Sequence, residues 1–227
     1  MQTAIHTATL PHPAVVMGGP ELGSLRLLAP AQPAGSLRLL AKDEEIYGEG
    51  DRAGFFYQVI SGAVRSYKLL SDGRRQIDAF HLPGDIFGLE SGSEHRFFAE
   101  AVGGAKIACF RRCSLESLAA SDGELSRTVV SAMMRSLERA QDHMVLLGRK
   151  SALEKIAAFL LELAERGGAN DSLELPMQRT DIADYLGLTI ETVSRSLTQL
   201  ERDGVIGLPS NRRIVLRNKA ALRRLNS

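Results

Sequence analysis

The sequence predicts an α+β protein in which a β-rich N-terminal roll is joined by one long helix to a helical C-terminal domain that ends in a β-hairpin. Three observations predict this order. Short β-prone runs separated by turn residues fill the first half, a long helical pattern follows, and short helical patterns with two strands close the chain. A length of 227 residues with 44% hydrophobic residues suffices for two modest cores.

The expected domains follow these changes of pattern. Residues 1–36 hold five of the eight prolines and are expected to form a flexible tail, which lacks the basic start and apolar core of a signal peptide. Residues 37–120 are assigned to the roll, 121–148 to a dimerisation helix and 149–227 to the C-terminal domain. No apolar run reaches the ~18 residues of a membrane span, so a cytoplasmic protein without membrane contact is expected.

The roll is predicted from short β-prone runs at residues 46–51, 56–68 and 75–80. Gly62 and the pair Asp72-Gly73 are turn signals within and between these runs. We therefore expect Val64–Leu70 and Gln76–Leu82 to pair as a hairpin.

A helical pattern runs from Gly123 to Leu147 and carries an apolar stripe with small and flexible members. The spacing resembles the a/d seam of a coiled coil, and we expect it to form a homodimer interface; the alternative is an ordinary helix packed on its own roll. The stripe comprises Leu125, Val129, Met133, Ser136, Ala140, His143 and Leu147.

A second amphipathic helix is expected at Ala152–Arg166, after a hinge at Gly148 and before the helix-ending pair Gly167-Gly168. The residues expected to face the core are Leu153, Ile156, Ala157, Leu160, Leu161 and Ala164.

Two short helices joined by a tight turn are predicted next. The first, Asp181–Leu186, has Thr180 as its expected N-cap and Gly187 as its stop, and its inward face is Ile182, Tyr185 and Leu186. The second, Ile190–Asp203, is expected to be capped by Thr189. Its expected inward residues are Ile190, Val193, Leu197 and Leu200, and its outward residues are Glu191, Thr192, Ser194 and Arg195.

A basic β-hairpin completes the pattern. Strands are expected at residues 205–208 and 214–216, with a cationic tip at 209–213. From Arg195 onward, eight Lys and Arg side chains oppose two acidic ones, whereas the whole chain has a formal charge of +1. Helix, turn, helix and basic wing together predict a reader of double-stranded DNA; the simpler interpretation is a small helical domain with a solvated charged face.

The candidate DNA contacts lie on the second helix and around it. Arg195 can donate two hydrogen bonds to guanine, Glu191 can accept from cytosine, and Ser194 can meet the edge of an A·T pair. The residues expected to contact the DNA backbone are Thr180, Thr189, Thr192, Arg212 and Arg213.

The run Asp184–Arg195 resembles the recognition motif of bacterial Crp/Fnr transcription regulators. Its E-x-x-S-R form, at Glu191 to Arg195, is that of the Fnr branch, and within the family the chain is most similar to FixK-type regulators. The resemblance implies a homodimeric activator whose β-roll is like that of cyclic-nucleotide-binding domains. It also implies that the protein binds an inverted TTGAT repeat and contacts RNA polymerase. The genes implied are those of low-oxygen and nitrogen metabolism.

No cyclic nucleotide is expected in the roll. Such a pocket needs a glycine-rich turn, a Glu for the ribose and an Arg-Ser pair for the phosphate, whereas the corresponding region holds Gly88-Leu89-Glu90 and Arg96-Phe97-Phe98. We expect Arg96 to be a surface residue and Phe97 or Phe98 to fill the roll. A regulator gated by another small molecule in the roll is the alternative, although such an effector is not favoured.

No cofactor, metal or catalytic site is expected elsewhere. An iron-sulfur cluster needs four thiolates, but the chain has only Cys109, expected in a buried strand, and Cys113, whose spacing also disfavours zinc. The five histidines are scattered, and no nucleophile, base and orienting group occur together. An enzyme is therefore not expected.

Overall fold

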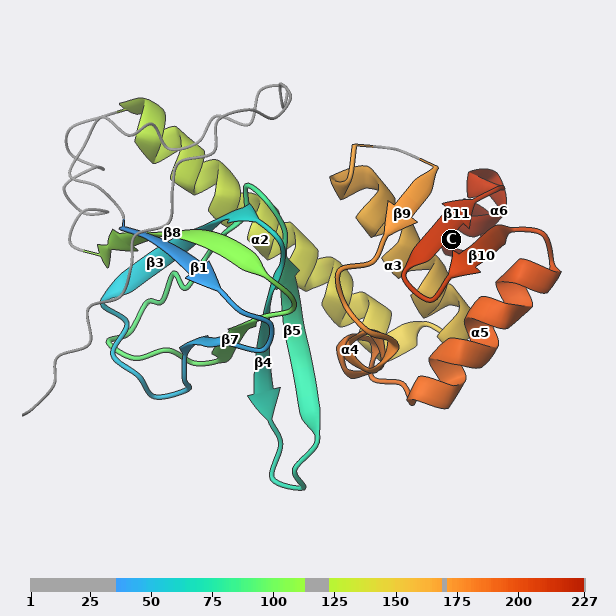
Figure 1. Cartoon of the computed structure of the whole chain (residues 1–227), viewed down its shortest axis with the longest axis horizontal. Helices are drawn as coiled ribbons and strands as arrows, with labels where there is room; N and C mark the ends of the chain where they lie inside the picture. Colours follow the sequence, from blue (N-terminus) through green and yellow to red (C-terminus); the bar gives the residue numbers. More distant parts are fainter. Residues whose placement is uncertain (1–35, 113–122, 169–170, 227) are drawn as a thin grey trace, which may run out of the picture.

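The computed structural model describes residues 36–112, 123–168 and 171–226, with side chains in the second range described from residue 127. The expected tail, apart from Ser36, and Cys113 lie outside this part of the chain. The α+β fold is confirmed: a β-roll and a helical domain lie at the two ends of a long helix (Figure 1). Within the described residues, no helix is long and apolar enough to cross a membrane.

The roll consists of two four-stranded antiparallel sheets. One has the order β1-β8-β3-β6 and the other β2-β7-β4-β5. Their bounds are β1 Ser36–Leu40, β2 Glu45–Tyr47, β3 Phe55–Ser61, β4 Val64–Leu69, β5 Arg75–His81, β6 Ile86–Phe87, β7 Phe98–Ala101 and β8 Ala105–Arg111. Apolar side chains between the sheets, including Val59, Val64 and Ile107, form the core of the roll.

The predicted hairpin is confirmed as β4 and β5, which pair antiparallel from Val64↔His81 to Leu69↔Arg75. Gly73 closes its turn with a φ of 82°, a left-handed conformation that favours glycine. Gly62 splits the predicted run 56–68 into two strands. A Cβ at this position would lie 2.4 Å from the carbonyl oxygen of Gly104, so no larger side chain fits without backbone movement.

Phe97 and Phe98 do not fill the roll, so that prediction is wrong. Both rings are half-buried, and Phe98 stacks on Tyr67 with 5.2 Å between ring centroids. Arg96 is exposed, as predicted, and lies over the Phe97 ring. Cys109 is buried in β8, as predicted, and burial raises the pKa of its thiol.

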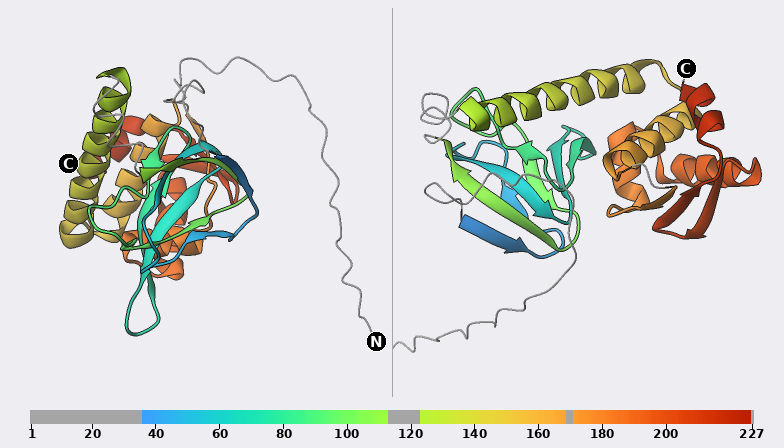
Figure 2. Two further views of the ribbon diagram at one scale, coloured as in Figure 1. Left: turned by 90° about the vertical axis from the view of Figure 1, so that its left-hand side faces the viewer. Right: turned by 90° about the horizontal axis from the view of Figure 1, so that it is seen from above.

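The long helix α2 extends over Gly123–Arg149 and passes along the roll toward the C-terminal domain (Figure 2). Gly148, expected to be a hinge, lies inside this helix. The break falls instead at Lys150 and Ser151, where the Ser151 side chain and Glu154 form a capping box for the next helix.

The inward face of α2 differs from the expected dimer stripe. Val129 and Ala132 are buried against Phe56 and Ile86 of the roll. His143 stacks on Tyr185 of the C-terminal domain with 4.0 Å between ring centroids. Leu147 is half-buried and packs against the core of that domain. Val129, His143 and Leu147 therefore make contacts within their own chain, while the side chain of Leu125 lies outside the described residues.

A different apolar stripe on α2 faces solvent. Met133, Ser136 and Ala140 of the expected stripe are exposed, and Met133 belongs to both sets. The large exposed apolar residues lie roughly a quarter of a turn around the helix from the expected stripe. They are Val130, Met133, Met134, Leu137, Met144 and Val145, and we call them the α2 apolar stripe.

The C-terminal domain contains four helices and a three-stranded sheet of order β10-β11-β9 in its described part. Its elements are α3 Ala152–Arg166, β9 Ser172–Glu174, α4 Arg179–Leu186, α5 Ile190–Arg202, β10 Ile206–Ser210, β11 Arg213–Leu216 and α6 Lys219–Asn226. Helix α3 has the predicted bounds, and its expected apolar face is buried except for the half-buried Leu153. The sequence interpretation missed β9 and α6.

The two domains meet along β5 and α4, where a buried charged cluster joins them. Asp181 of α4 accepts hydrogen bonds from Arg65 at 2.9 Å and from Arg75 at 2.6 Å. Arg75 also donates to Asp184, and Arg65 donates to Glu100 within the roll. Arg65 and Asp181 are both nearly inaccessible to water, so both need oppositely charged partners to offset the cost of burial. We call these five residues the interdomain ion cluster.

Aromatic packing continues this interface. The Tyr185 ring of α4 lies 5.3 Å from the Phe80 ring of β5 and 5.8 Å from the Phe159 ring of α3, measured between centroids. His143 of α2 covers another side of Tyr185, and neither of its buried ring nitrogens has a hydrogen-bond partner. One apolar core thus continues from the roll into the C-terminal domain.

The stability of this interface should depend on pH through His143. Burial, with Lys155 nearby, lowers the pKa of His143 from 6.5 to about 4. Between these two pH values the unfolded chain therefore binds more protons than the folded one. The neutral His143 adds its full share to the free energy of unfolding above pH 6.5, and this share is lost as the pH falls toward 4. His143→Phe keeps the stacked ring without a basic nitrogen. Between pH 7 and 5, we expect the free energy of unfolding to fall by about 1 kcal/mol more in the wild type than in this variant.

Urea denaturation of both proteins at the two pH values measures this difference. The pKa of the buried His81 is also lowered to about 4, but His81 titrates in both proteins and so cancels in the comparison. Parallel pH profiles would show that His143 is not the titrating group.

Candidate DNA interface

The first helix of the predicted helix-turn-helix begins earlier than expected. Gln178, with extended backbone angles, precedes α4, and its backbone N–H donates to Asp181 Oδ2 at 3.1 Å. Thr180 lies in the first turn and is exposed, so its predicted role as N-cap is wrong. The Asp181 carboxylate takes the capping role because it lies within reach of the free N–H groups of this turn.

The turn between the helices is formed as predicted. Gly187 ends α4 with a φ of 60°, in the left-handed region. Thr189 caps α5, because its hydroxyl accepts from the backbone N–H of Thr192 at 3.2 Å. The buried Lys155 Nζ donates to the carbonyl of Leu186 at 3.1 Å and so satisfies the C-terminal end of α4.

Helix α5 buries one face and exposes the other. Val193, Leu197 and Leu200 are almost wholly buried, as predicted. Ile190 was expected to join them but is 41% exposed. It occupies the first turn of the helix, which projects beyond the core of the domain.

The three expected base-contacting side chains lie together on the opposite face of α5. Glu191 and Arg195 are exposed, and Ser194 is half-exposed between them. The pKa of Glu191 is lowered, first by its own backbone N–H, then by the Thr189 hydroxyl and by Arg195. Its carboxylate is therefore held ionised as a hydrogen-bond acceptor, while Arg195 offers only donors.

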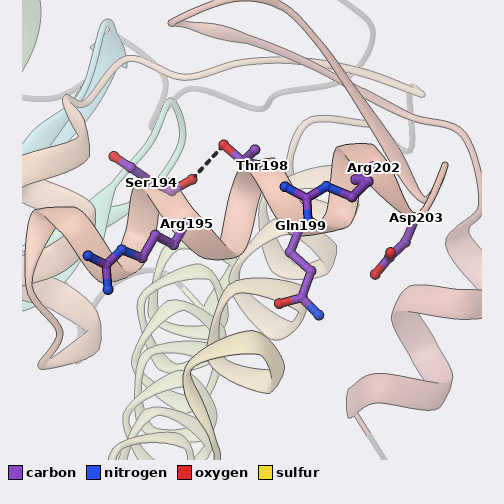
Figure 3. Close-up of a pocket in the computed structure, with 6 residues that line it drawn as sticks. All are labelled: Ser194, Arg195, Thr198, Gln199, Arg202 and Asp203. Atoms are coloured by element: carbon purple, nitrogen blue, oxygen red, sulfur yellow. Dashed lines mark hydrogen bonds between the residues drawn. The ribbon is translucent and has the colours of Figure 1, made fainter.

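A shallow concavity continues from these residues along α5. It is lined by Ser194, Arg195, Thr198, Gln199, Arg202 and Asp203, which Figure 3 shows along one flank of the helix. The Thr198 hydroxyl donates to the carbonyl of Ser194 at 3.0 Å. Thr198, Gln199 and Arg202 were not among the predicted DNA contacts, although their spacing of three, four and seven from Arg195 places them on the same side of α5.

The wing is confirmed as a hairpin with a shorter tip than predicted. Ser210 pairs with Arg213, which leaves only Asn211 and Arg212 in the turn. Arg212 and Arg213 are both exposed, and Arg213 Nε donates to the Ser172 hydroxyl at 3.0 Å. Pairing of β11 with β9 anchors the hairpin on its second side.

Arg179 is a further residue beside the candidate interface that the sequence interpretation did not single out. Arg179, the first residue of α4, is half-buried, and its Nη1 donates to Ser194 Oγ at 3.3 Å. Its buried Nε has no hydrogen-bond partner. No local sequence signal marks this contact, because Arg179 and Ser194 lie on different helices.

The interior of the roll does not fit a cyclic nucleotide. Five rings, those of His95, Tyr47, Tyr57, Phe87 and His81, stack in sequence with 3.6 to 5.6 Å between neighbouring centroids. The Tyr57 and Tyr47 rings also cover Gly88, whose turn would have to present its amides to a phosphate.

The polar residues of this region are also unsuited to a nucleotide. Glu90 accepts from the backbone N–H of Arg96 at 3.2 Å, and the Arg96 side chain is outside the roll. The described residues contain no group of three or more His, Cys, Asp or Glu side chains placed to hold a metal ion.

Comparisons with known families match both domains. The model of the Crp-like helix-turn-helix domain matches residues 154–225, and that of the cyclic nucleotide-binding domain matches residues 37–122. The second match establishes the fold of the roll, while its ring-filled interior and exposed Arg96 depart from a nucleotide pocket.

Individual relatives match nearly the whole chain. It is 49% identical over 206 residues to the nitrogen fixation regulation protein FixK of Azorhizobium caulinodans, covering 87% of this chain and 83% of the relative. It is 46% identical over 215 residues to the protein of the same name from Rhizobium meliloti, covering 93% and 98%. The solved structure of FixK2 from Bradyrhizobium japonicum superimposes with a TM-score of 0.81 at 52% identity, covering 86% of this chain and 98% of that one. These relatives are regulators rather than enzymes.

Proposed function

Because the chain belongs to the Crp/Fnr family of transcription regulators and is FixK-like, we propose that it binds an inverted TTGAT-type repeat as a homodimer without a bound cofactor. It is a transcription regulator with a helix-turn-helix DNA-binding domain. In the proposed role it mainly activates genes of low-oxygen and nitrogen metabolism, and it contacts RNA polymerase through exposed surfaces of the roll and the C-terminal domain. The names of its FixK relatives support the nitrogen-metabolism part of this gene class.

The observation that carries the proposal is the exposed face of α5. Glu191, Ser194 and Arg195 project from the N-terminal half of a helix whose other face is buried, which is the arrangement by which a recognition helix enters the major groove. In this role Arg195 donates to guanine, Glu191 accepts from a cytosine amino group, and Ser194 contacts an A·T pair.

Phosphate contacts surround these three residues in the proposed complex. Thr180, Thr189 and Thr192 lie at the N-terminal ends of α4 and α5, and all three have solvent-accessible side chains. Arg212 and Arg213 extend the contact to the wing. Five polar or cationic side chains around a recognition helix suit the sequence-independent part of DNA binding, which weakens as salt is added.

Two features support a mechanism in which the protein binds DNA without an effector. The stacked rings occupy the interior of the roll, where an effector would have to bind. The interdomain ion cluster holds α4 against β5 through contacts within the chain. An effector acts by favouring one arrangement of the two domains, and here the protein supplies such contacts itself.

A band shift with purified protein tests this function. We expect the protein without additives to bind a duplex carrying the inverted TTGAT repeat at least 1,000-fold more tightly than a scrambled duplex, on the order of the smallest specificity ratio typical of specific DNA binding. The duplex with a single half-site is the matched control for the inverted arrangement. Selective binding that arises only after a small molecule is added would instead favour the effector-gated regulator, and equal binding to all duplexes would overturn the proposal.

The proposed dimer interface is the α2 apolar stripe. Its residues follow the helical spacings of three, four and seven, with adjacent pairs at Met133-Met134 and Met144-Val145, and side chains such as Val130, Leu137 and Met144 are more than half exposed in the single chain. Of the stripe expected from the sequence, Met133, Ser136 and Ala140 are exposed, His143 and Leu147 are half-buried, and Val129 is buried, so we propose that the interface is centred on the α2 apolar stripe. A two-fold interface matches the symmetry of an inverted repeat.

Leu137→Glu should therefore shift the protein from dimer to monomer, because the change places two carboxylates in an apolar seam. Ser131→Glu, an exposed position about a third of a turn away, adds the same charge outside the stripe and should leave the dimer intact. Analytical ultracentrifugation of both variants measures the outcome. A dimeric Leu137→Glu protein would show that another surface joins the two copies.

Arg195→Ala should weaken binding to the repeat by about 1 to 3 kcal/mol and remove discrimination at one G·C pair, since a bidentate contact is lost. Arg213→Ala, the matched control on the wing, should weaken all duplexes alike. Titrations against every single-base variant of one half-site distinguish these patterns. Unchanged discrimination in Arg195→Ala would remove this residue from the base-contacting set.

A further inference from the structure

We propose that Arg179 is a positioning residue that makes the Ser194 hydroxyl a hydrogen-bond donor toward DNA. The proposal rests on the proposed function, because it requires Ser194 to face a base edge. Its starting point is the bond from Arg179 Nη1 to Ser194 Oγ, 3.3 Å long, which joins the beginning of α4 to the exposed face of α5.

The chemistry of the two groups sets the direction of the bond. A guanidinium has five N–H donors and no acceptor, whereas a hydroxyl has one proton and two acceptor lone pairs. Arg179 must therefore donate, and Ser194 must use a lone pair to accept. The Ser194 proton cannot point at Arg179 and remains available in another direction.

The other hydrogen bond at this position does not use that proton. The Thr198 hydroxyl donates to the backbone carbonyl of Ser194, not to its side chain (Figure 3). In the described part of the chain, no hydrogen bond donated by the Ser194 hydroxyl is recorded. The half-exposed hydroxyl can then donate outward from the face that carries Glu191 and Arg195.

The Arg179 side chain is half-buried and has few polar partners in the described part of the chain. Its Nε is buried without a partner, which is unfavourable for a charged donor and uncommon in native structures. Within the described residues, the Arg179 guanidinium makes its hydrogen bond to Ser194.

The consequence is a rule for base recognition. A free serine hydroxyl can donate or accept, whereas one that already accepts from Arg179 has one lone pair occupied and its proton directed away from Arg179, so it favours an acceptor on the base edge. The O4 of thymine and the N7 of a purine are such acceptors in the major groove, and the amino groups of cytosine and adenine are not. Arg179 would thereby sharpen the preference at the base pair that Ser194 contacts, without touching that pair itself.

Arg179→Met and Ser194→Ala, alone and combined in the full-length protein, test this coupling. Each variant is titrated against the inverted repeat and all its single-base variants. Ser194→Ala should flatten discrimination at one pair, and Arg179→Met should reduce discrimination at that same pair by about fivefold, the loss of roughly one hydrogen bond. Arg179→Met should have no further effect at that pair when Ser194 is already alanine, and Arg179→Lys, which retains a donor, should restore part of the preference.

Arg224→Met is the matched control, because it removes an exposed charge from α6 of the same domain without contacting Ser194. It should leave the discrimination at every pair unchanged. The positioning role would be overturned if Arg179→Met weakened binding to all duplexes alike. It would also be overturned if the losses of discrimination caused by Arg179→Met and Ser194→Ala simply added in the double variant. A wild-type protein that does not prefer the repeat at all would overturn the proposed function instead, so the two failures are distinguishable.

Changing the DNA provides a test that does not depend on the folding of a variant. At the pair identified with Ser194→Ala, the purine is replaced by its 7-deaza analogue, or the thymine by an analogue without O4. Removal of the acceptor should weaken binding of the wild type and leave binding of Ser194→Ala unchanged. Equal weakening of both proteins, or of neither, would contradict a donating Ser194.

Discussion

The pairing of Asp181 with Arg65 and Arg75 is the interaction on which the arrangement of the domains depends. The carboxylate and the Arg65 guanidinium are both removed from water, so the pair needs its hydrogen bonds to offset the cost of burying two charges. The other Asp181 oxygen accepts the Gln178 N–H at the beginning of α4. One side chain therefore both starts this helix and fixes it to the roll.

The orientation of the recognition helix follows from this attachment. Only Gly187, Leu188 and Thr189 separate α4 from α5, and each end of this turn is closed by a defined backbone conformation or cap. With α4 fixed to β5, α5 has little freedom relative to the roll. The rings of Phe80, Phe159 and Tyr185 reinforce the same contact.

Helix α2 shows why a periodic pattern alone does not distinguish a helix face packed within the chain from one exposed to solvent. It has two apolar faces: one, with Val129 and Ala132, packs on the roll, and the other is the α2 apolar stripe. The stripe expected from the sequence took members from both faces, because residues three and four apart on adjacent faces also form a regular series. Burial within the chain is what distinguishes the two.

The sequence by itself determined the order of domains, the β4–β5 hairpin, α3, the Gly187 stop, the Thr189 cap and the exposed trio on α5, because each rests on local backbone preferences or on spacing along one element. Tertiary structure decided the rest. The interdomain ion cluster, the contact of Arg179 with Ser194, strand β9 and the ring stack in the roll all join residues distant in the chain. Their pairing depends on the packing of whole elements, for which a single sequence carries no local signal.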